Sequence, residues 1–458
     1  MTHSSVTAAT PGVRCLLAGT MLYTALAAGI LHAQGAGRIH FERYTLPNGL
    51  EVLLAPDRSS QVVAVDVWYL AGSREEPADK AGLARLFERL MFAGSASVAP
   101  GGHSRLLEDV GSRLSADVDE ERARFSESVP SNRLNLALWL EADRMGSLAI
   151  NDSSVAQARL GLLDDLSQRV NEEPYAAAIL DALASLYDSG GCPGYAHPTI
   201  GRQGSITRLT TADARAFFQT RYAPNNARLV VAGDFDAAAT RQLITQYFGS
   251  LPRGPAATGP ACTPTFNPGA RTKALSDRSI ARAAVGQFYR LPAHDHADGP
   301  ALELLGLVLS QGTGSRLATT VARDARAAIA TQGGILSDRR GPQVFVLFAV
   351  AAPDVTPDSL GALLAAQARW AAGDGATEND LTRAKNIYRA TAISGRERPA
   401  DIADQLQHAA VFHGSADDAN AEVDRVLAVT LADLRRVAQT WLVPENALTL
   451  VISPGADS

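Results

Sequence analysis

The order of predicted strands and helices, which occurs twice around one Gly- and Pro-rich segment, is the feature that most constrains this fold. The first half holds predicted strands at 51–54, 62–69 and 228–234 and predicted helices at 80–92, 134–145 and 156–170. The second half holds predicted strands at 283–289, 344–350 and 447–453 and predicted helices at 299–310, 314–326, 376–393 and 399–413. Residues 249–270 are dense in Gly, Pro and Thr and predict a linker. The repeated order indicates an internal duplication, although strand pairing cannot be taken from the pattern.

Residues 1–33 are predicted to be an export signal. An apolar run at 15–30 follows Arg14, and no acidic residue occurs before Glu42. Ala33 then offers a small residue for cleavage. An uncleaved anchor is the alternative, because the run extended to Ala33 approaches the length that spans a bilayer. Cleavage is favoured because the run is diluted by Ala and Gly and lacks a charged flank, so the mature chain is expected to be periplasmic or otherwise exported, and soluble.

Composition excludes several classes of protein without selecting one. Lys+Arg 42 against Asp+Glu 48 gives a formal net charge of −6, which is too mild for a nucleic-acid binder. Three cysteines rule out a disulfide-dense scaffold and a zinc module built from four cysteines. Cleavage would leave Cys192 and Cys262, and we favour two separate thiols over a disulfide.

The helix predicted at 80–92 carries a compact charged cluster. Arg85, Glu88 and Arg89 have the spacing i, i+3 and i+4, so one helical face holds two guanidinium groups and a carboxylate. From this chemistry alone, a solvated face with salt bridges is the simplest interpretation.

Short segments in a fixed order resemble the insulinase/pitrilysin family of zinc metallopeptidases, in particular the non-catalytic subunits of the processing-peptidase type. These segments are Leu-Pro-Asn-Gly-Leu at 46–50, 68–76, 82–92, Val-Pro at 129–130, Leu-Glu-Ala-Asp-Arg-Met at 140–145, Pro-Tyr at 174–175, 197–201, Tyr-Ala-Pro-Asn-Asn-Ala at 222–227, 233–235, 314–317 and 383–386. The resemblance covers essentially everything from Phe41 to Pro454. It implies an α+β fold with two homologous domains, 34–248 and 271–458, each an antiparallel-rich β-sheet flanked by α-helices.

The family's zinc motif is degenerate in this chain. Active members carry H-x-x-E-H, in which two histidines bind zinc and the glutamate activates the metal-bound water. The histidine positions fall on Arg85 and Arg89, and the glutamate falls on Glu88. Arg offers a metal no lone pair, and two fixed cations would repel a divalent ion. We expect Glu88 to be ionised and paired rather than to act as a base.

The other positions that the resemblance assigns to the active site also depart from the family pattern. The third zinc ligand, a Glu in the family, falls on the stretch that holds Asp164 and Asp165, and one shorter ligand cannot replace two lost ones. The cleft-lining segment reads Arg-Leu-Ser-Ala-Asp at 113–117. Arg323 is a weak match to a substrate-binding Arg, and the Tyr that accompanies it in the family falls on Ile329 or Ala330. We therefore expect no catalytic residue and no bound metal, with salt bridges from Arg85 and Arg89 to Asp164 or Asp165 in place of zinc.

The histidines are not predicted to supply another active site. The segment His294-Asp295-His296 is interpreted as a solvated loop rather than a metal site. His408 and His413 are five residues apart, a spacing poorly suited to one face of an α-helix, so core or surface roles are favoured. His103 has no partner that the sequence identifies. The chain also contains no G-x-S-x-G and no P-loop motif.

The resemblance implies an exported, non-catalytic subunit that pairs with an active insulinase-family chain carrying H-x-x-E-H. It would help to enclose peptide substrates and would hold extended peptides on an edge strand by β-augmentation. Zinc is expected only in the partner, and neither nucleic acid nor stable membrane insertion is expected. One alternative is a stand-alone peptide-binding scaffold. Another, less favoured, is an autonomous metallopeptidase with a site built from Glu88, Asp164 or Asp165 and a histidine elsewhere.

Overall fold

The computed structural model describes residues 37–171, 173–187, 191–266 and 268–455, so the predicted signal at 1–33 lies outside the described residues. The chain divides into two units, Met1–His40 and Phe41–Ser458, and both halves of the predicted repeat lie in the second unit. Within the described part of the chain, no helix is long and apolar enough to cross a bilayer.

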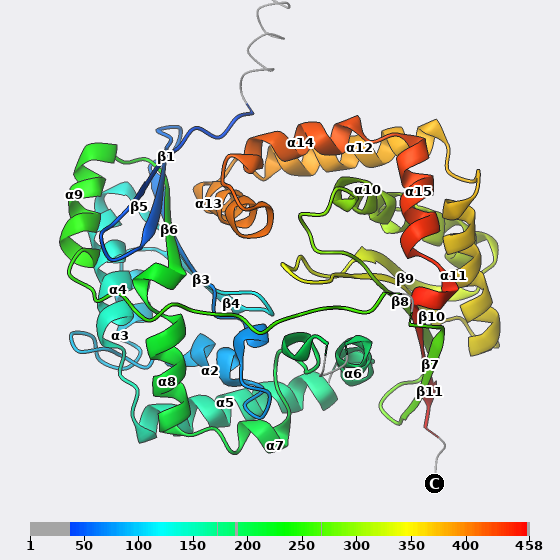
Figure 1. The fold of residues 1–458 in the computed structure, drawn as a ribbon, viewed down its shortest axis with the longest axis horizontal. Helices are drawn as coiled ribbons and strands as arrows, with labels where there is room; N and C mark the ends of the chain where they lie inside the picture. The colour runs from blue at the N-terminus through cyan, green and yellow to red at the C-terminus, as the bar shows by residue number, and fades with distance from the viewer. Residues whose placement is uncertain (1–36, 172, 188–190, 267, 456–458) are drawn as a thin grey trace, which may run out of the picture. The chain divides into compact units, whose positions relative to one another are not determined.

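Two β-sheets, one in each half, organise the unit Phe41–Ser458 (Figure 1). The first sheet has the order β1-β2-β6-β3-β5-β4 and comprises β1 (Glu42–Thr45), β2 (Glu51–Pro56), β3 (Val62–Tyr69), β4 (Arg113–Val118), β5 (Ala123–Pro130) and β6 (Ala227–Gly233). The second has the order β7-β11-β8-β10-β9 and comprises β7 (Arg271–Asp277), β8 (Ala284–Arg290), β9 (Ala328–Ile335), β10 (Val344–Ala351) and β11 (Ala447–Pro454). Each sheet contains one parallel pair, β2–β6 or β7–β11, and its other neighbouring strands are antiparallel. The α+β, antiparallel-rich fold class is confirmed.

The two sheets share one topology once β1 is set aside, because β2-β6-β3-β5-β4 matches β7-β11-β8-β10-β9 position by position. A pair of buried asparagines extends this match to single residues. The side chain of Asn226, just before β6, donates to the carbonyl oxygens of Leu70 and Arg221. Asn446, just before β11, donates in the same way to the carbonyl oxygens of Arg290 and Trp441. The repeated element order therefore reflects a duplicated structure.

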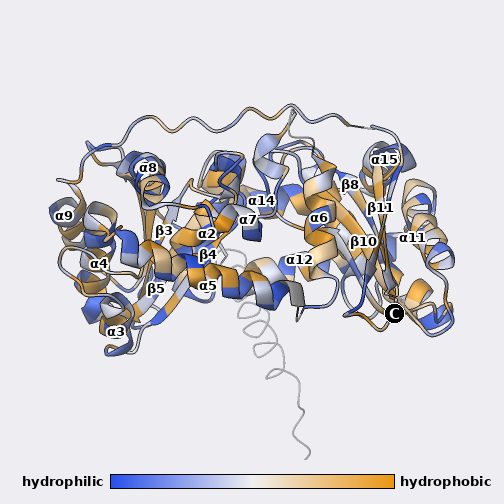
Figure 2. Cartoon of the chain, turned by 90° about the horizontal axis from the view of Figure 1, so that it is seen from below, coloured by the Kyte–Doolittle hydropathy of each residue, from blue (hydrophilic) through white to orange (hydrophobic). Residues whose placement is uncertain are grey.

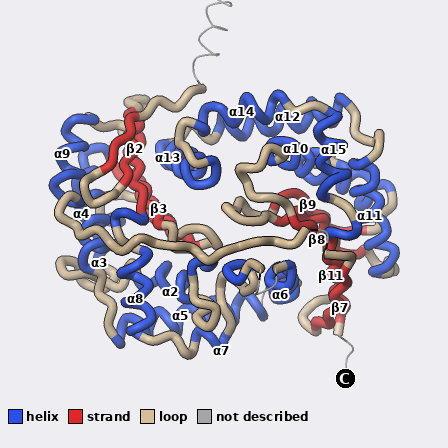
Figure 3. The backbone as a smooth tube through the Cα atoms, in the orientation of Figure 1, coloured by secondary structure: helices blue, strands red, loops and turns tan. Residues whose placement is uncertain are grey.

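Helices surround both sheets (Figure 3). The first half contains α2 (Leu83–Leu90), α3 (Gly102–Glu108), α4 (Leu134–Ser147), α5 (Asp152–Asn171), α6 (Ala176–Leu186), α7 (Gln203–Ile206), α8 (Thr211–Arg221) and α9 (Ala237–Phe248). The second half contains α10 (Gly299–Ser310), α11 (Pro357–Ala372), α12 (Glu378–Ser394), α13 (Pro399–His408), α14 (Asp418–Ala428) and α15 (Leu431–Trp441). Two π-helical segments, η5 (Leu317–Asp324) and η6 (Ala409–His413), and short 3₁₀ turns complete the elements. The 3₁₀ turns are η1 (Ser73–Glu75), η2 (Ser131–Arg133), η3 (Pro193–Tyr195), η4 (Pro224–Asn226) and η7 (Pro444–Asn446).

Local sequence accounts for where several helices begin. Capping boxes of the form Thr-x-x-Asp start three helices: Thr210 with Asp213 for α8, Thr377 with Asp380 for α12, and Thr430 with Asp433 for α15. The predicted helix at 299–310 coincides with α10. The predictions at 314–326 and 399–413 are correct about helical backbone but missed the wider π-helical turns of η5 and η6.

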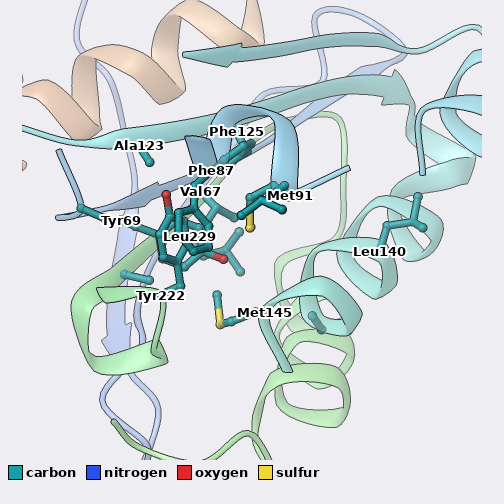
Figure 4. Close-up of a cluster of buried hydrophobic side chains, with 14 of the residues drawn as sticks. Val67, Tyr69, Phe87, Met91, Ala123, Phe125, Leu140, Met145, Tyr222 and Leu229 are labelled. Carbon is teal, nitrogen blue, oxygen red and sulfur yellow. The ribbon is translucent and has the colours of Figure 1, made fainter. Parts of the chain in front are cut away.

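The hydrophobic core lies along the two sheets and the helices packed on them. The strands β8, β10 and β11 are largely apolar, whereas the helices that cover them carry both polar and apolar residues (Figure 2). In the first half, Phe87 of α2 stacks on Tyr222 with ring centroids 4.6 Å apart, and Tyr222 in turn lies 4.7 Å from Tyr69 of β3 (Figure 4). Burial of these aromatic rings fixes α2 against the sheet.

The connection at 249–270 contains neither helix nor strand among its described residues and runs between α9 and β7, as the long green segment of Figure 1. It is anchored by a disulfide between Cys192 and Cys262, so the expectation of two separate thiols is wrong. The two cysteines are separated by 70 residues, and sequence spacing alone does not report that their Cα atoms lie 4.2 Å apart.

The two halves are joined by buried and half-buried charges around the β4–β5 and β9–β10 loops. Glu121 accepts hydrogen bonds from Arg74 at 3.2 Å and from Arg340 at 2.8 Å. Glu120 pairs with Arg339 at 2.9 Å. Because Arg339 and Arg340 belong to the second half and the glutamates to the first, these pairs hold the two loops together.

Candidate functional site

The helix α2 presents an apolar face to the core and a charged face away from it. It begins after Gly82, whose φ of 100° is the left-handed conformation that favours glycine. Glu76 caps this end, because its carboxylate accepts hydrogen bonds from the N–H groups of Gly82 at 3.0 Å and Ala84 at 2.6 Å. The core-facing residues are Leu83, Ala84, Leu86, Phe87 and Leu90. The remaining face carries Arg85, Glu88 and Arg89, as the spacing predicts.

Arg89 forms a bidentate ion pair with Asp165 of α5. Arg89 Nη2 lies 2.6 Å from Asp165 Oδ1, and Arg89 Nε lies 3.2 Å from Asp165 Oδ2. Gly161 leaves the space for this guanidinium, since a Cβ at that position would lie 2.8 Å from Arg89 Cζ. The expected salt bridge between Arg89 and one of the two aspartates is confirmed by these distances.

Arg85 has different partners from those expected. Its Nη1 lies 2.5 Å from Glu88 Oε2 and donates to the carbonyl oxygen of Val118 at 3.1 Å. Asp164 points elsewhere and accepts a hydrogen bond from Gln168 at 3.4 Å. The prediction that Arg85 pairs with Asp164 or Asp165 is therefore wrong, because a partner one helical turn away on α2 is within easier reach.

The pKa of the Glu88 carboxyl depends more on burial than on the cationic neighbours of this residue. Burial raises the pKa of its carboxyl above the ordinary value, although Arg85 acts in the opposite direction. Asp117 and Asp165 add to the rise. The expectation that Glu88 is paired is confirmed by its contact with Arg85, and its expected ionisation stays a prediction.

The zinc ion that the family motif implies does not fit these residues. Both histidine positions hold guanidinium groups, which have no lone pair for a metal. The two carboxylates that could serve as ligands are already bound by those guanidinium groups, Glu88 by Arg85 and Asp165 by Arg89. Each of the two guanidinium groups balances the charge of one carboxylate.

The hydrogen bond from Arg85 to Val118 connects α2 to the edge strand β4, which contains the segment 113–117. β4 is the outermost strand of its sheet and pairs with β5. An outermost strand keeps one row of backbone N–H and C=O groups directed away from its own sheet. The ion pairs and this strand edge together form the candidate site.

Arg323 lies apart from α2, near the end of η5 in the second half. Its side chain is 67% exposed and pairs with the adjacent Asp324 at 3.0 Å. Ile329, one candidate for the missing Tyr position, is an exposed residue of the outermost strand β9. Sequence order placed this weak match in the second half, and its suggested role in substrate binding stays a prediction.

The histidines have partners that the sequence did not reveal. His103 Nε2 lies 2.5 Å from Glu127 Oε1 in a buried cluster with Glu141 and Arg144. His294, His408 and His413 lie together in the second half, and only 14% of the His294 side chain is exposed. The interpretation as a solvated loop is therefore wrong for His294, whereas Asp295 and His296 are exposed as expected. Glu127 belongs to a strand and carried no motif, so no signal in the sequence could have identified it as the partner of His103.

Comparisons with known proteins agree with the duplicated fold. The model described as Insulinase (Peptidase family M16) matches residues 51–188, and the model described as Peptidase M16 inactive domain matches residues 208–388. This chain belongs to the M16 (insulinase) family. Among curated proteins, the chain is similar to the zinc protease PqqE of Helicobacter pylori, with 26% identity over 93% of this chain and 95% of that protein.

Solved structures of M16 proteins share the fold. A protease from Helicobacter pylori superimposes with a TM-score of 0.86 at 24% identity, over 91% of this chain and all of that one (100%). The periplasmic protease PqqL from Escherichia coli superimposes with a TM-score of 0.73 at 18% identity, over 90% of this chain and 47% of that one. At these identities the likeness concerns the fold alone.

Proposed function

We propose that this chain is a non-catalytic M16 subunit that binds peptides and pairs with an active zinc metallopeptidase of the same family. The observation that carries the proposal is the replacement of the zinc site by two ion pairs on a retained M16 fold. Arg85 and Arg89 occupy the ligand positions, and each neutralises a carboxylate that would otherwise be available. In this proposal the chain holds no zinc at α2, and the metal that cleaves peptides belongs to the partner.

The outer edge of β4 is proposed to bind extended peptides by strand addition. The backbone of an edge strand supplies hydrogen bonds regardless of peptide sequence, while neighbouring side chains give selectivity. Arg85 supports this role because it fixes the last residue of β4 through the Val118 carbonyl oxygen. Arg323 is proposed to bind substrate from the second half, where its exposed guanidinium is available to a peptide carbonyl or carboxylate.

Export to the periplasm or a similar compartment is part of the proposal. A disulfide between Cys192 and Cys262 suits an oxidising compartment. The similar protein PqqL is described as periplasmic. The predicted signal at 1–33 would direct such export.

Reconstitution with a catalytic partner tests the proposal. The exported chain is mixed with an M16 chain from the same organism that carries H-x-x-E-H, and peptide hydrolysis and co-elution are measured. We expect the mixture to hydrolyse peptides at least ten-fold faster than the partner alone. Replacing the partner's motif glutamate by Gln should abolish this activity, whereas Glu88→Gln in this chain should leave it unchanged.

The same experiment separates the alternatives. Peptide binding without co-elution or rate enhancement would favour a stand-alone scaffold. Peptide hydrolysis by this chain alone, lost in Glu88→Gln, would favour an autonomous metallopeptidase and overturn the proposal.

A further inference from the structure

Three histidines from separate segments converge in the second half of the chain. His294 lies in the loop between β8 and α10, His408 ends α13, and His413 ends η6. One ring nitrogen of each lies within 4.8 Å of the corresponding nitrogens of the other two. The Nε2 atoms of His294 and His413 are 3.2 Å apart. Two N–H groups cannot face each other at this distance, so at least one of these nitrogens presents a lone pair.

The π-helical turn η6 explains how two residues five positions apart share this site. In an α-helix, residues at i and i+5 point in different directions, and this is why the sequence argued against a joint role for His408 and His413. A π-turn has i→i+5 hydrogen bonding, which brings positions five apart onto one side. Such turns occur frequently at functional sites.

Carboxylates hold the imidazole rings in place. Asp338 Oδ1 lies 3.0 Å from His294 Nδ1, and Asp338 Oδ2 lies 2.8 Å from His408 Nε2. Asp338 therefore contacts one nitrogen of each ring and leaves the other nitrogen available as a ligand. A carboxylate that orients a metal-binding histidine through its second nitrogen is the usual arrangement in metal sites.

We propose that His294, His408 and His413 bind a divalent metal ion of the zinc class, with Glu422 of α14 held beside His413 as a neighbouring negative charge. Zinc–nitrogen bonds of about 2.0–2.1 Å in a tetrahedron place neighbouring ligand atoms about 3.4 Å apart. The Nε2 atoms of His294 and His413 are 3.2 Å apart, and His413 Nε2 lies 3.3 Å from Glu422 Oε2. Three imidazole ligands suit zinc, nickel or cobalt rather than calcium or magnesium.

The charge around this cluster favours a cation. The cavity has a volume of about 140 Å³ and is lined by Glu303, Asp338 and Glu422 besides the three histidines. Among the described residues that line it, none is Lys or Arg. The other cluster that groups histidine with glutamates, around His103, differs because Arg144 already supplies a buried positive charge there.

A wider cleft adjoins the histidine cavity. A cavity of about 530 Å³, lined by residues of α12, α13 and α14, shares Tyr388, His408 and Glu422 with the histidine cavity. These shared side chains separate the cluster from the wider cleft.

The metal would connect the two halves of the chain. α13, which contributes His408, also contacts the first sheet, because Gln407 donates to the carbonyl oxygens of Asp66 at 3.2 Å and Arg228 at 3.0 Å. Binding at His408 would fix this helix relative to the His294 and Asp338 loops of the second half. The site is separate from α2 and does not depend on the proposed function.

Zinc titration of the metal-stripped, full mature chain tests this site. The protein is treated with a chelator, titrated with zinc chloride and assayed by calorimetry and by elemental analysis after gel filtration. We expect one equivalent of zinc per chain, at least ten-fold weaker binding in His294→Ala and His413→Ala, and an increase in Tm that these variants lose. His296→Ala is the matched control, because His296 lies two residues from His294 but outside the cluster, and it should bind as the wild type does.

Three results would overturn the proposal. The first is a wild-type chain that retains no zinc, and the second is unchanged binding in both alanine variants. The third is loss of zinc in Glu88→Gln, which would place the ion at α2 instead. If an alanine variant does not fold, cobalt(II) is added to the wild type instead. The proposal requires the visible absorption of tetrahedral cobalt, and a spectrum without this absorption contradicts the site.

Discussion

At the scale of single residues, the surroundings of Arg89 match the shape and charge of its guanidinium group. Asp165 accepts both of its hydrogen bonds, and Gly161 leaves room beside them. Because both side chains remain partly exposed, we expect Asp165→Asn to lower the free energy of unfolding by only about 0.5–1 kcal/mol. Asp164→Asn is the neighbouring control and should change it little. Urea unfolding of both variants measures the difference, and equal stability losses would show that the Arg89 pair contributes nothing specific.

His103 gives a pH dependence at the same scale. Burial lowers the pKa of its imidazole to about 3, with Arg144 contributing in the same direction. The unfolded chain takes up a proton at His103 near pH 6.5, while the folded chain does so only near pH 3. The stability that the neutral, buried imidazole contributes to the folded state is therefore complete above pH 6.5 and is lost as the pH falls from about 6.5 to about 3. We expect His103→Gln to reduce the proton uptake on unfolding between pH 6 and 4 by up to about one proton, and with it the slope of the free energy of unfolding against pH. A slope identical to that of the wild type would contradict the assignment.

At the scale of elements, the start of α2 depends on a residue outside the helix. Gly82 has no side chain to cap the first turn of α2. Glu76 supplies the cap instead, because its carboxylate accepts hydrogen bonds from the N–H groups of Gly82 and Ala84. We expect Glu76→Ala to destabilise the protein by about 1–3 kcal/mol, because these buried donors lose their partner. Asp79→Ala, an exposed change in the same loop, should cost less than about 0.5 kcal/mol. Similar losses in thermal unfolding for both would show that Glu76 does not cap α2.

At the scale of the whole molecule, the disulfide restrains the long connection between the two sheets. Cys192 and Cys262 close a loop of 70 residues, and cross-links of this length stabilise proteins by about 2–4 kcal/mol through the unfolded state. We expect the double variant Cys192→Ser/Cys262→Ser to unfold at a correspondingly lower urea concentration. Reductant should destabilise the wild type by a similar amount and leave the double variant unaffected. An effect of reductant on the double variant would show that the disulfide is not its target.

The sequence determined the features that depend on neighbours along the chain. Hydrophobic periodicity predicted the duplicated order of elements, and the i, i+3, i+4 spacing predicted one charged face on α2. The types of residue at the zinc-ligand positions do not fit the family's metal at α2, because Arg cannot donate a lone pair in any fold. The family followed from the order of short segments.

Only the tertiary structure decided contacts between distant segments. It paired Cys192 with Cys262, selected Asp165 rather than Asp164 for Arg89, and gave His103 of α3 a partner on the strand β5. The clearest case is His408 and His413, which the α-helical period separates and the π-turn brings together beside His294. Periodicity reports the direction of a side chain only while the backbone keeps one helical geometry. Packing can change that geometry, and it alone sets which remote side chains meet.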